Sequence, residues 1–82
     1  MQGALISLDR LALGSFGKVR SLTAWGAARR RLLDLGLVAD TRVEALRKSP
    51  SGDPTAYQIR GAVIALRSEE ASQILVEAVN ID

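Results

Sequence analysis

Apolar residues recur at helical spacing in one stretch of the chain and at strand-like spacing in most of the rest. Ala28, Leu32 and Leu35 fall three or four positions apart, with three arginines between the first two. Gly36 follows the last residue of this repeat, where helices commonly end in a left-handed conformation that glycine adopts readily. The pattern predicts a short basic helix that ends at Leu35, with Leu37 folded back against Leu32.

The strand-like segments are short and are separated by glycine and proline. In one of them Val43 and Ala45 share a face, and Leu46 breaks the alternation, which indicates either a bulge or a second, partly covered face. The turn residues at 50–54 and then Gly61 separate the following segments, which predicts two successive antiparallel hairpins. The five predicted strands cover residues 18–23, 41–49, 55–60, 62–66 and 74–79.

Two further helical turns are expected, one capped by Ser7 and one capped by Ser68 just before the last strand. Five short strands with one inserted helix predict a mainly β fold, a small barrel, because closure removes the strand edges that would otherwise be exposed. Six apolar residues are expected to be buried together in its core: Leu32, Leu35, Val43, Ile59, Ile64 and Val76.

The length of 82 residues predicts one domain over residues 1–82. Cysteine is absent, no apolar run approaches the ~20 residues of a membrane span, and the first residues do not form a secretory signal. These features predict a soluble cytoplasmic domain that is not inserted in a membrane. The net charge is only +2, with 11 basic against 9 acidic residues, which argues against a strong field for nucleic acid.

The residue types that carry most enzyme chemistry are missing. There is no histidine base, no cysteine nucleophile and no glycine-rich phosphate loop with its lysine. Imidazole and thiolate, which suit ferrous iron, are absent as well. We therefore expect no catalytic residue, no cofactor and no metal site, because the carboxylates are scattered over separate elements: Asp9, Asp34, Asp40, Asp53, Glu69 and Glu70.

Four short motifs stand in a distinctive order: Arg-Leu-Leu-Asp-Leu-Gly-Leu at 31–37, Gly-Asp-Pro at 52–54, Ala-Leu-Arg at 65–67 and Ile-Leu-Val at 74–76. Together, over most of the chain, they resemble the FeoA family of small cytoplasmic proteins in bacterial ferrous-iron uptake. The resemblance implies a small SH3-like five-stranded barrel with an inserted short helix and a second helical turn before the last strand.

The chain departs from the family pattern in two loops. Family members often carry Pro-Gly after the helix, where this chain has Ala39 and Asp40. They also usually place apolar residues around the Gly-Asp-Pro turn, where this chain has Ser51 and Thr55. Changes of this kind leave the fold in place but alter any partner surface that includes these loops.

The resemblance implies a non-enzymatic module that docks on the ferrous iron permease, a membrane protein with a cytoplasmic GTP-binding domain. The alternatives are a small nucleic-acid-binding barrel and a regulator's SH3-like interaction domain, since a similar domain ends some metal-dependent repressors. Residues before Leu8 are too few for a DNA-binding helix-turn-helix, which favours a stand-alone module without a nucleic-acid partner. The oligomeric state is left open.

The candidate partner-binding residues lie on the basic helix and on the Gly-Asp-Pro turn. Each has a structural interpretation beside the functional one: the arginines as a solvated face with an Arg30–Asp34 pair, the tryptophan as a lid over one end of the barrel, and the turn as simple turn chemistry. The candidates for binding are Trp25, Arg29, Arg30, Ser51 and Asp53, and those for structure are Leu32, Leu35, Gly36, Gly52 and Pro54.

Overall fold

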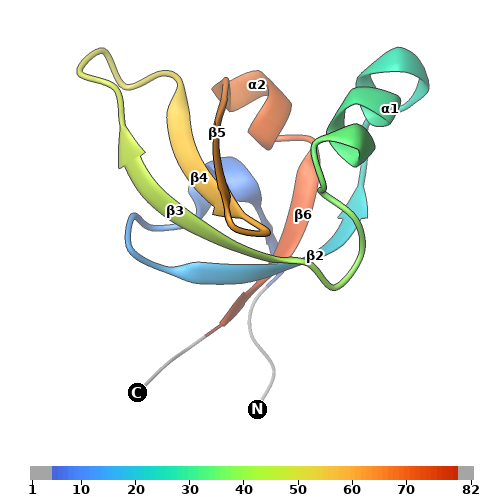
Figure 1. The fold of residues 1–82 in the computed structure, drawn as a ribbon, viewed down its shortest axis with the longest axis horizontal. Coiled ribbons are helices and arrows are strands. Elements are labelled where there is room, and N and C mark those ends of the chain that lie inside the picture. The colour runs from blue at the N-terminus through green and yellow to red at the C-terminus, as the bar shows by residue number, and fades with distance from the viewer. Residues whose placement is uncertain (1–4, 80–82) are drawn as a thin grey trace.

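The computed structural model describes residues 5–79, in which one antiparallel sheet of six strands carries two short α-helices and a 3₁₀ turn (Figure 1). The strands follow the order β1-β6-β2-β3-β4-β5 across the sheet. The elements are β1 Leu5–Ser7, the 3₁₀ turn η1 Leu8–Arg10, β2 Phe16–Leu22, α1 Gly26–Asp34, β3 Arg42–Lys48, β4 Thr55–Ile59, β5 Ala62–Leu66, α2 Ser68–Ala71 and β6 Ile74–Val79.

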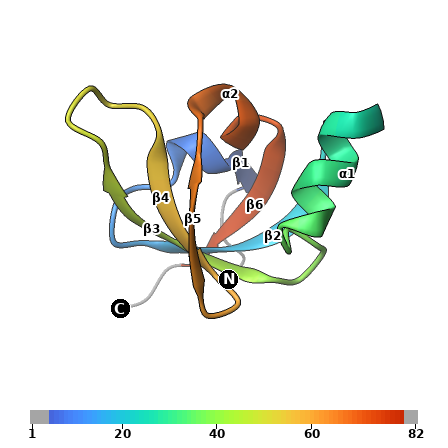
Figure 2. The same ribbon diagram turned by 45° about the horizontal axis from the view of Figure 1, so that its top comes forward.

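The sheet curls around a single core. Figures 1 and 2 show α2 over the open side of the curled sheet, while α1 projects from its flank. All five predicted strands are present, and the class is mainly β as expected. The sheet has one more strand than predicted, because Leu5–Ser7 pairs with β6, with Leu5 opposite Glu77 and Ser7 opposite Leu75. Three residues are too few to show an alternating pattern, so only the neighbouring strand reveals this one.

Closure of the barrel is the second point of difference. The strand order ends at β1 on one side and at β5 on the other, so within residues 5–79 the ladder does not close. The two ends are instead bridged by packing, since α2 lies against η1. The fold is a strongly curled sheet. At the end of its spatial order lies β5, which has only β4 as a neighbouring strand within residues 5–79.

The predicted hairpins and the bulge in β3 are confirmed. The β4–β5 turn consists of Arg60 and Gly61, both with positive φ (52° and 82°), as a two-residue type I′ turn requires. The register between β3 and β4 shifts across Leu46, and a second shift in β2, which was not predicted, falls at Arg20. Bulges of this kind increase the local twist and so help the sheet to curl.

Four of the six predicted core residues, Leu32, Val43, Ile59 and Val76, are at most 2% exposed. The other two, Leu35 and Ile64, are only partly buried and pack against that core. Ile64 lies on the end strand β5, which has no second neighbour to cover it. The largest fully buried side chains are Leu8, Leu37, Ile59, Leu66, Ile74, Val19, Val43 and Val76.

The end of α1 has the predicted geometry. Leu35 is the C-cap residue and Gly36 has φ 103°. The Gly36 N–H donates to the Leu33 carbonyl at 3.0 Å and the Leu37 N–H donates to the Leu32 carbonyl at 3.1 Å. This is the Schellman pair of bonds, and it brings the buried Leu32 and Leu37 to the same point of the core.

The predicted serine caps are confirmed only in part. Ser7 is the N-cap residue of η1, but its side chain makes no capping bond. The N-cap of α2 is Arg67 rather than Ser68. A carboxylate from a distant turn takes the role instead, because the Ser68 N–H donates to Asp53 Oδ1 at 2.8 Å. Glu70 supports the same helix start by accepting from the Arg67 N–H at 3.0 Å.

We predict that Gly36→Val lowers the free energy of unfolding by about 2 kcal/mol or more, since a Cβ at positive φ costs about 1–2 kcal/mol even before β-branching is counted. The new side chain would also meet Arg60 Cδ at 3.2 Å from its Cβ. Chemical denaturation measures the change. Gly36→Asn is the control, because asparagine tolerates this conformation, and equal losses in the two variants would contradict the argument.

We predict that Leu32→Ala costs about 2–5 kcal/mol of unfolding free energy, the range for buried leucines whose cavity does not fully collapse. Leu32 is 2% exposed and anchors α1 to the sheet. Leu13→Ala is the matched control, since Leu13 is 50% exposed and its loss belongs with surface changes of about 0.5 kcal/mol. A loss below about 1 kcal/mol at Leu32 would show that α1 does not depend on this contact.

Candidate partner-binding surface

The first half of α1 stands free of the core. Every residue from 25 to 31 is exposed, and Trp25 is 84% exposed. The preceding Ala24 is buried, so the chain leaves the core between these two residues. The interpretation of Trp25 as a lid over the barrel is therefore wrong. Ala28 shares the helical spacing of Leu32 and Leu35, but it too is exposed, because α1 crosses the edge of the core rather than lying along it.

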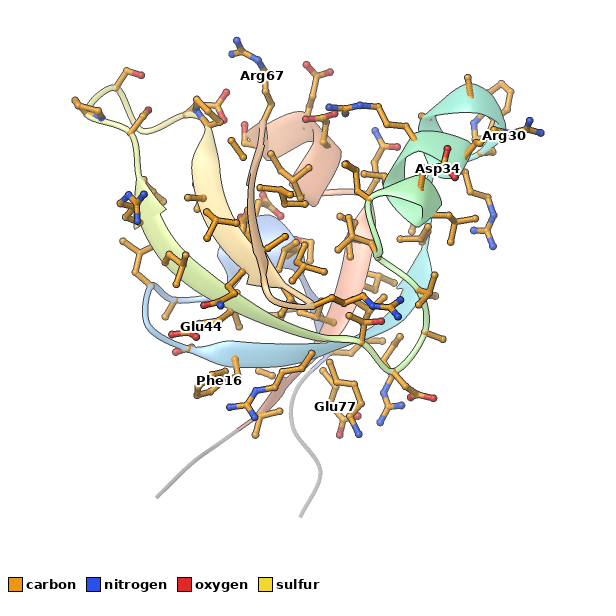
Figure 3. The ribbon with its side chains drawn as sticks, viewed as in Figure 1. Phe16, Arg30, Asp34, Glu44, Arg67 and Glu77 are labelled. Carbon is orange, nitrogen blue, oxygen red and sulfur yellow. The ribbon has the colours of Figure 1, made fainter. Side chains whose placement is uncertain are left out.

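The three arginines of α1 have different surroundings. Arg29 and Arg30 have no ion pair with any carboxylate in residues 5–79, and the predicted Arg30–Asp34 pair is not formed there. Arg31, in contrast, forms an ion pair with Glu70 of α2. Figure 3 shows Arg30 on the projecting end of α1, away from the sheet. The free positive charge of the helix is therefore that of Arg29 and Arg30.

The Gly-Asp-Pro turn is used within the fold. Asp53 accepts the Ser68 N–H, and its second carboxylate oxygen lies 3.7 Å from the Arg67 guanidinium. The Ser51 hydroxyl donates to the Asp53 carbonyl at 3.0 Å. Gly52 has φ 93°, and the Asp53–Pro54 peptide bond is cis. These contacts support the structural interpretation of the turn.

The structure does not bring the two groups of candidates together. Figures 1 and 2 place the β3–β4 turn and α1 on opposite sides of α2. They are connected through α2 by the Arg31–Glu70 and Arg67–Asp53 pairs. Between them lies an open groove of about 550 Å³, lined by Ala28, Arg31, Pro54, Ala65, Arg67, Glu69, Glu70 and Gln73.

Sequence reasoning missed this groove, and no residue spacing would have indicated it. Its apolar side chains, Ala28, Pro54 and Ala65, come from α1, from the turn before β4 and from β5. These elements are distant in the chain and are brought together only by the curl of the sheet. The exposed small residues on α1 and β5 are the one local signal, and it is weak by itself.

A charged cluster on another face explains one departure from the family pattern. Arg20 Nε donates to Glu77 Oε1 at 2.8 Å, and its Nη1 donates to Asp40 Oδ1 at 2.9 Å. The hydrogen bond to Glu77 raises the pKa of Arg20 above its ordinary value. Asp40 has φ 71°, at the position where the resemblance places glycine. Aspartate tolerates this conformation better than most residues, and here its side chain is also held by Arg20.

The aromatic residues lie on separate parts of the molecule. Tyr57 is buried, and burial raises its pKa, while its hydroxyl donates to the Leu8 carbonyl at 3.5 Å. The Arg42 guanidinium covers Phe16, 3.8 Å from the ring centre, and Trp25 lies at the start of α1. They do not line a common wall of the kind that holds proline-rich peptides or stacked bases.

Across residues 5–79 no group of three or more potential metal ligands gathers at one point. In the same residues no helix has the length and apolar character needed to cross a membrane.

Comparison with known proteins gives consistent matches. The model of the FeoA domain matches residues 6–78. A curated relative, the Fe(2+) transport protein A/Fe(2+) transporter FeoB fusion protein of Porphyromonas gingivalis, is 29% identical over 73 residues, which are 89% of this chain. The chain spans only about 9% of the length of that fusion protein.

Two solved structures show the same fold. FeoA of Chlorobium tepidum is 38% identical with a TM-score of 0.85, over 94% of this chain and 73% of that one. FeoA of Stenotrophomonas maltophilia, a prokaryotic SH3 domain protein solved in complex with zinc, is 31% identical with a TM-score of 0.77, over 94% of this chain and 89% of that one. The expected SH3-like architecture is thereby confirmed, and the chain belongs to the FeoA domain family.

Proposed function

We propose that this chain is a non-enzymatic accessory module of bacterial ferrous iron uptake that docks in the cytoplasm on the GTP-binding part of the ferrous iron permease. The observation that carries the proposal is the fusion relative, in which a domain of this family and the transporter FeoB share one polypeptide. Two domains fused in one organism are commonly partners elsewhere, because fusion only raises the effective concentration of a contact that already exists.

The surface we assign to this docking is the free half of α1. It combines an exposed tryptophan with the charges of Arg29 and Arg30, which have no ion pair within residues 5–79. Trp and Arg are the residue types most enriched among interface residues that dominate binding energy. Docking there would bias the conformational or nucleotide-bound populations of the permease to the extent that one of its states binds α1 more tightly.

We predict that reversing both Arg29 and Arg30 to Glu slows association with the permease's cytoplasmic domain by about tenfold and weakens its salt dependence. Charges at the rim of an interface act mainly on the association rate, which salt screens. Both residues are exposed and form no ion pair with the described residues, so the variant should fold normally. Association kinetics at two salt concentrations, with circular dichroism to check folding, measure the effect.

The matched control is the double variant Arg10→Glu and Arg47→Glu. It changes the net charge by the same amount, but it places the changes on η1 and β3, where both residues are also exposed. Equal slowing in the two variants would reduce the effect to overall charge. Normal kinetics in the Arg29 and Arg30 variant would remove α1 from the mechanism, and absence of binding by the wild type would remove the permease as the partner.

We also predict that the isolated chain does not bind ferrous iron stoichiometrically. It contains neither histidine nor cysteine, so a site would need carboxylates from separate elements. Anaerobic titration calorimetry with ferrous iron tests this. A saturable site in the micromolar range would sink the prediction and would make metal binding part of the function.

A further inference from the structure

β5 is an end strand with an unpaired edge. It pairs with β4 on one side only, from Thr55 opposite Leu66 to Ile59 opposite Ala62. Within the described part of the chain, residues 62–66 make no backbone hydrogen bond beyond that ladder. In Figures 1 and 2 the side of β5 that is away from β4 is turned toward α1. Ala65 of β5 and Ala28 of α1 both line the groove between these two elements.

The turn geometry identifies the free backbone groups. In a two-residue hairpin the residues that flank the turn, here Ile59 and Ala62, form a hydrogen-bonded pair, and such pairs alternate along the ladder. Ala62, Ile64 and Leu66 therefore direct their N–H and C=O groups toward β4. Val63 and Ala65 direct theirs to the open edge. Each offers one donor and one acceptor to an incoming strand.

Within the described residues, β5 itself carries no charged side chain, proline or bulge along its open edge. Natural proteins blunt exposed edges with charged side chains, proline, bulges or very short strands. β5 has five residues, all apolar, with a regular register against β4. Val63 is 55% exposed, and Ala62 and Ala65 are exposed as well. At the opposite end of the sheet the edge strand β1 has only three residues.

Positive charges stand at both ends of β5. Arg60 precedes it and has no ion pair in residues 5–79. Arg67 follows it, stands at the outer rim of the molecule in Figure 3, and has only the 3.7 Å contact with Asp53. If a second copy paired antiparallel about Ile64, Arg67 of one copy would lie opposite Gly61 of the other, next to that copy's Arg60, at both ends. Like charges so placed oppose that pairing and favour a strand with acidic ends.

We propose that the free edge of β5 binds an extended apolar segment, flanked by carboxylates at both ends, by β-strand addition. Main-chain bonds to Val63 and Ala65 would hold the segment, and Arg60 and Arg67 would fix its register. The inference depends on the function proposed above in one respect only, namely that the permease is the protein that carries the segment. It is separate from the docking of α1, because different residues make the two contacts.

The test uses a capped nonapeptide, EEVTVTVEE, added to the full chain labelled with ¹⁵N. We expect saturable shifts at the β5 amides and slower hydrogen exchange at Val63 and Ala65, the two amides that gain a bond. The peptide KKVTVTVKK, and EEVTVTVEE with alternate backbone nitrogens methylated, should bind at least about fivefold more weakly, since each loses one of the two proposed contributions.

Protein variants test the same contacts from the other side. Ala65→Pro removes a donor at the open edge without removing a bond to β4, and it should abolish binding. Val63→Thr, which keeps its N–H, is the matched control and should bind like the wild type. Arg60→Gln with Arg67→Gln should weaken binding by about fivefold, the upper end for exposed charges. This charge variant decides the matter if Ala65→Pro does not fold.

Absence of shifts at about 1 mM peptide, near the weak limit for a short strand, would overturn the proposal. Equal binding of the methylated peptide would do the same, and so would dimerisation through β5 in place of peptide binding. The outcome for the permease is distinct. If its cytoplasmic domain binds Ala65→Pro as well as wild type, the edge is excluded and the proposed function stands. If the peptide binds and the permease does not, the edge stands and the proposed function fails.

Discussion

The left-handed conformation of Gly36 determines how α1 sits on this domain. By ending the helix there, the Schellman bonds turn the chain so that Leu32 and Leu37 enter the core together. Leu32 is the only buried residue of α1 in the described structure, so the helix is anchored by its C-terminal half alone. Within the described residues, the first half of the helix is exposed along its whole length. The exposure of Trp25, Arg29 and Arg30 follows from where the helix is anchored, as much as from their own chemistry.

The small α2 helix has a comparable role on the other side of the groove. Four residues cannot form a stable helix unaided, and α2 is held by contacts from outside itself. Asp53 accepts a hydrogen bond from its first residue, Arg31 pairs with its Glu70, and Ala71 is fully buried. The Gly-Asp-Pro turn and the basic helix, far apart in sequence, therefore act on the same short element. This arrangement supports the structural interpretation of the Gly-Asp-Pro turn, whose Asp53 holds the first residue of α2.

Incomplete closure of the sheet leaves β5 as an apolar edge next to α1. A closed barrel would have paired that edge internally, and a longer connection would have covered it. The groove between β5, α2 and α1 results from this incomplete closure of the sheet, and its walls differ in character. The α1 wall carries Ala28 and the ion-paired Arg31, whereas the β5 wall offers main-chain groups between two arginines.

Local sequence determined the elements whose physical cause is local. The helix end at Gly36, the hairpin at Gly61, the bulge at Leu46 and the buried faces of β3 and β4 all follow from spacing and backbone preference. The family was recognisable from four motifs in order. Tertiary structure alone decided the rest. Leu5–Ser7 is a strand because β6 lies beside it. The side chain of Ser68 does not cap α2, because Asp53 accepts the hydrogen bond from the first N–H of that helix. Ala28 is exposed because α1 crosses the edge of the core at Leu32. Each of these depends on which segments become neighbours when the sheet curls, and that arrangement is determined by the packing of the whole domain rather than by local sequence.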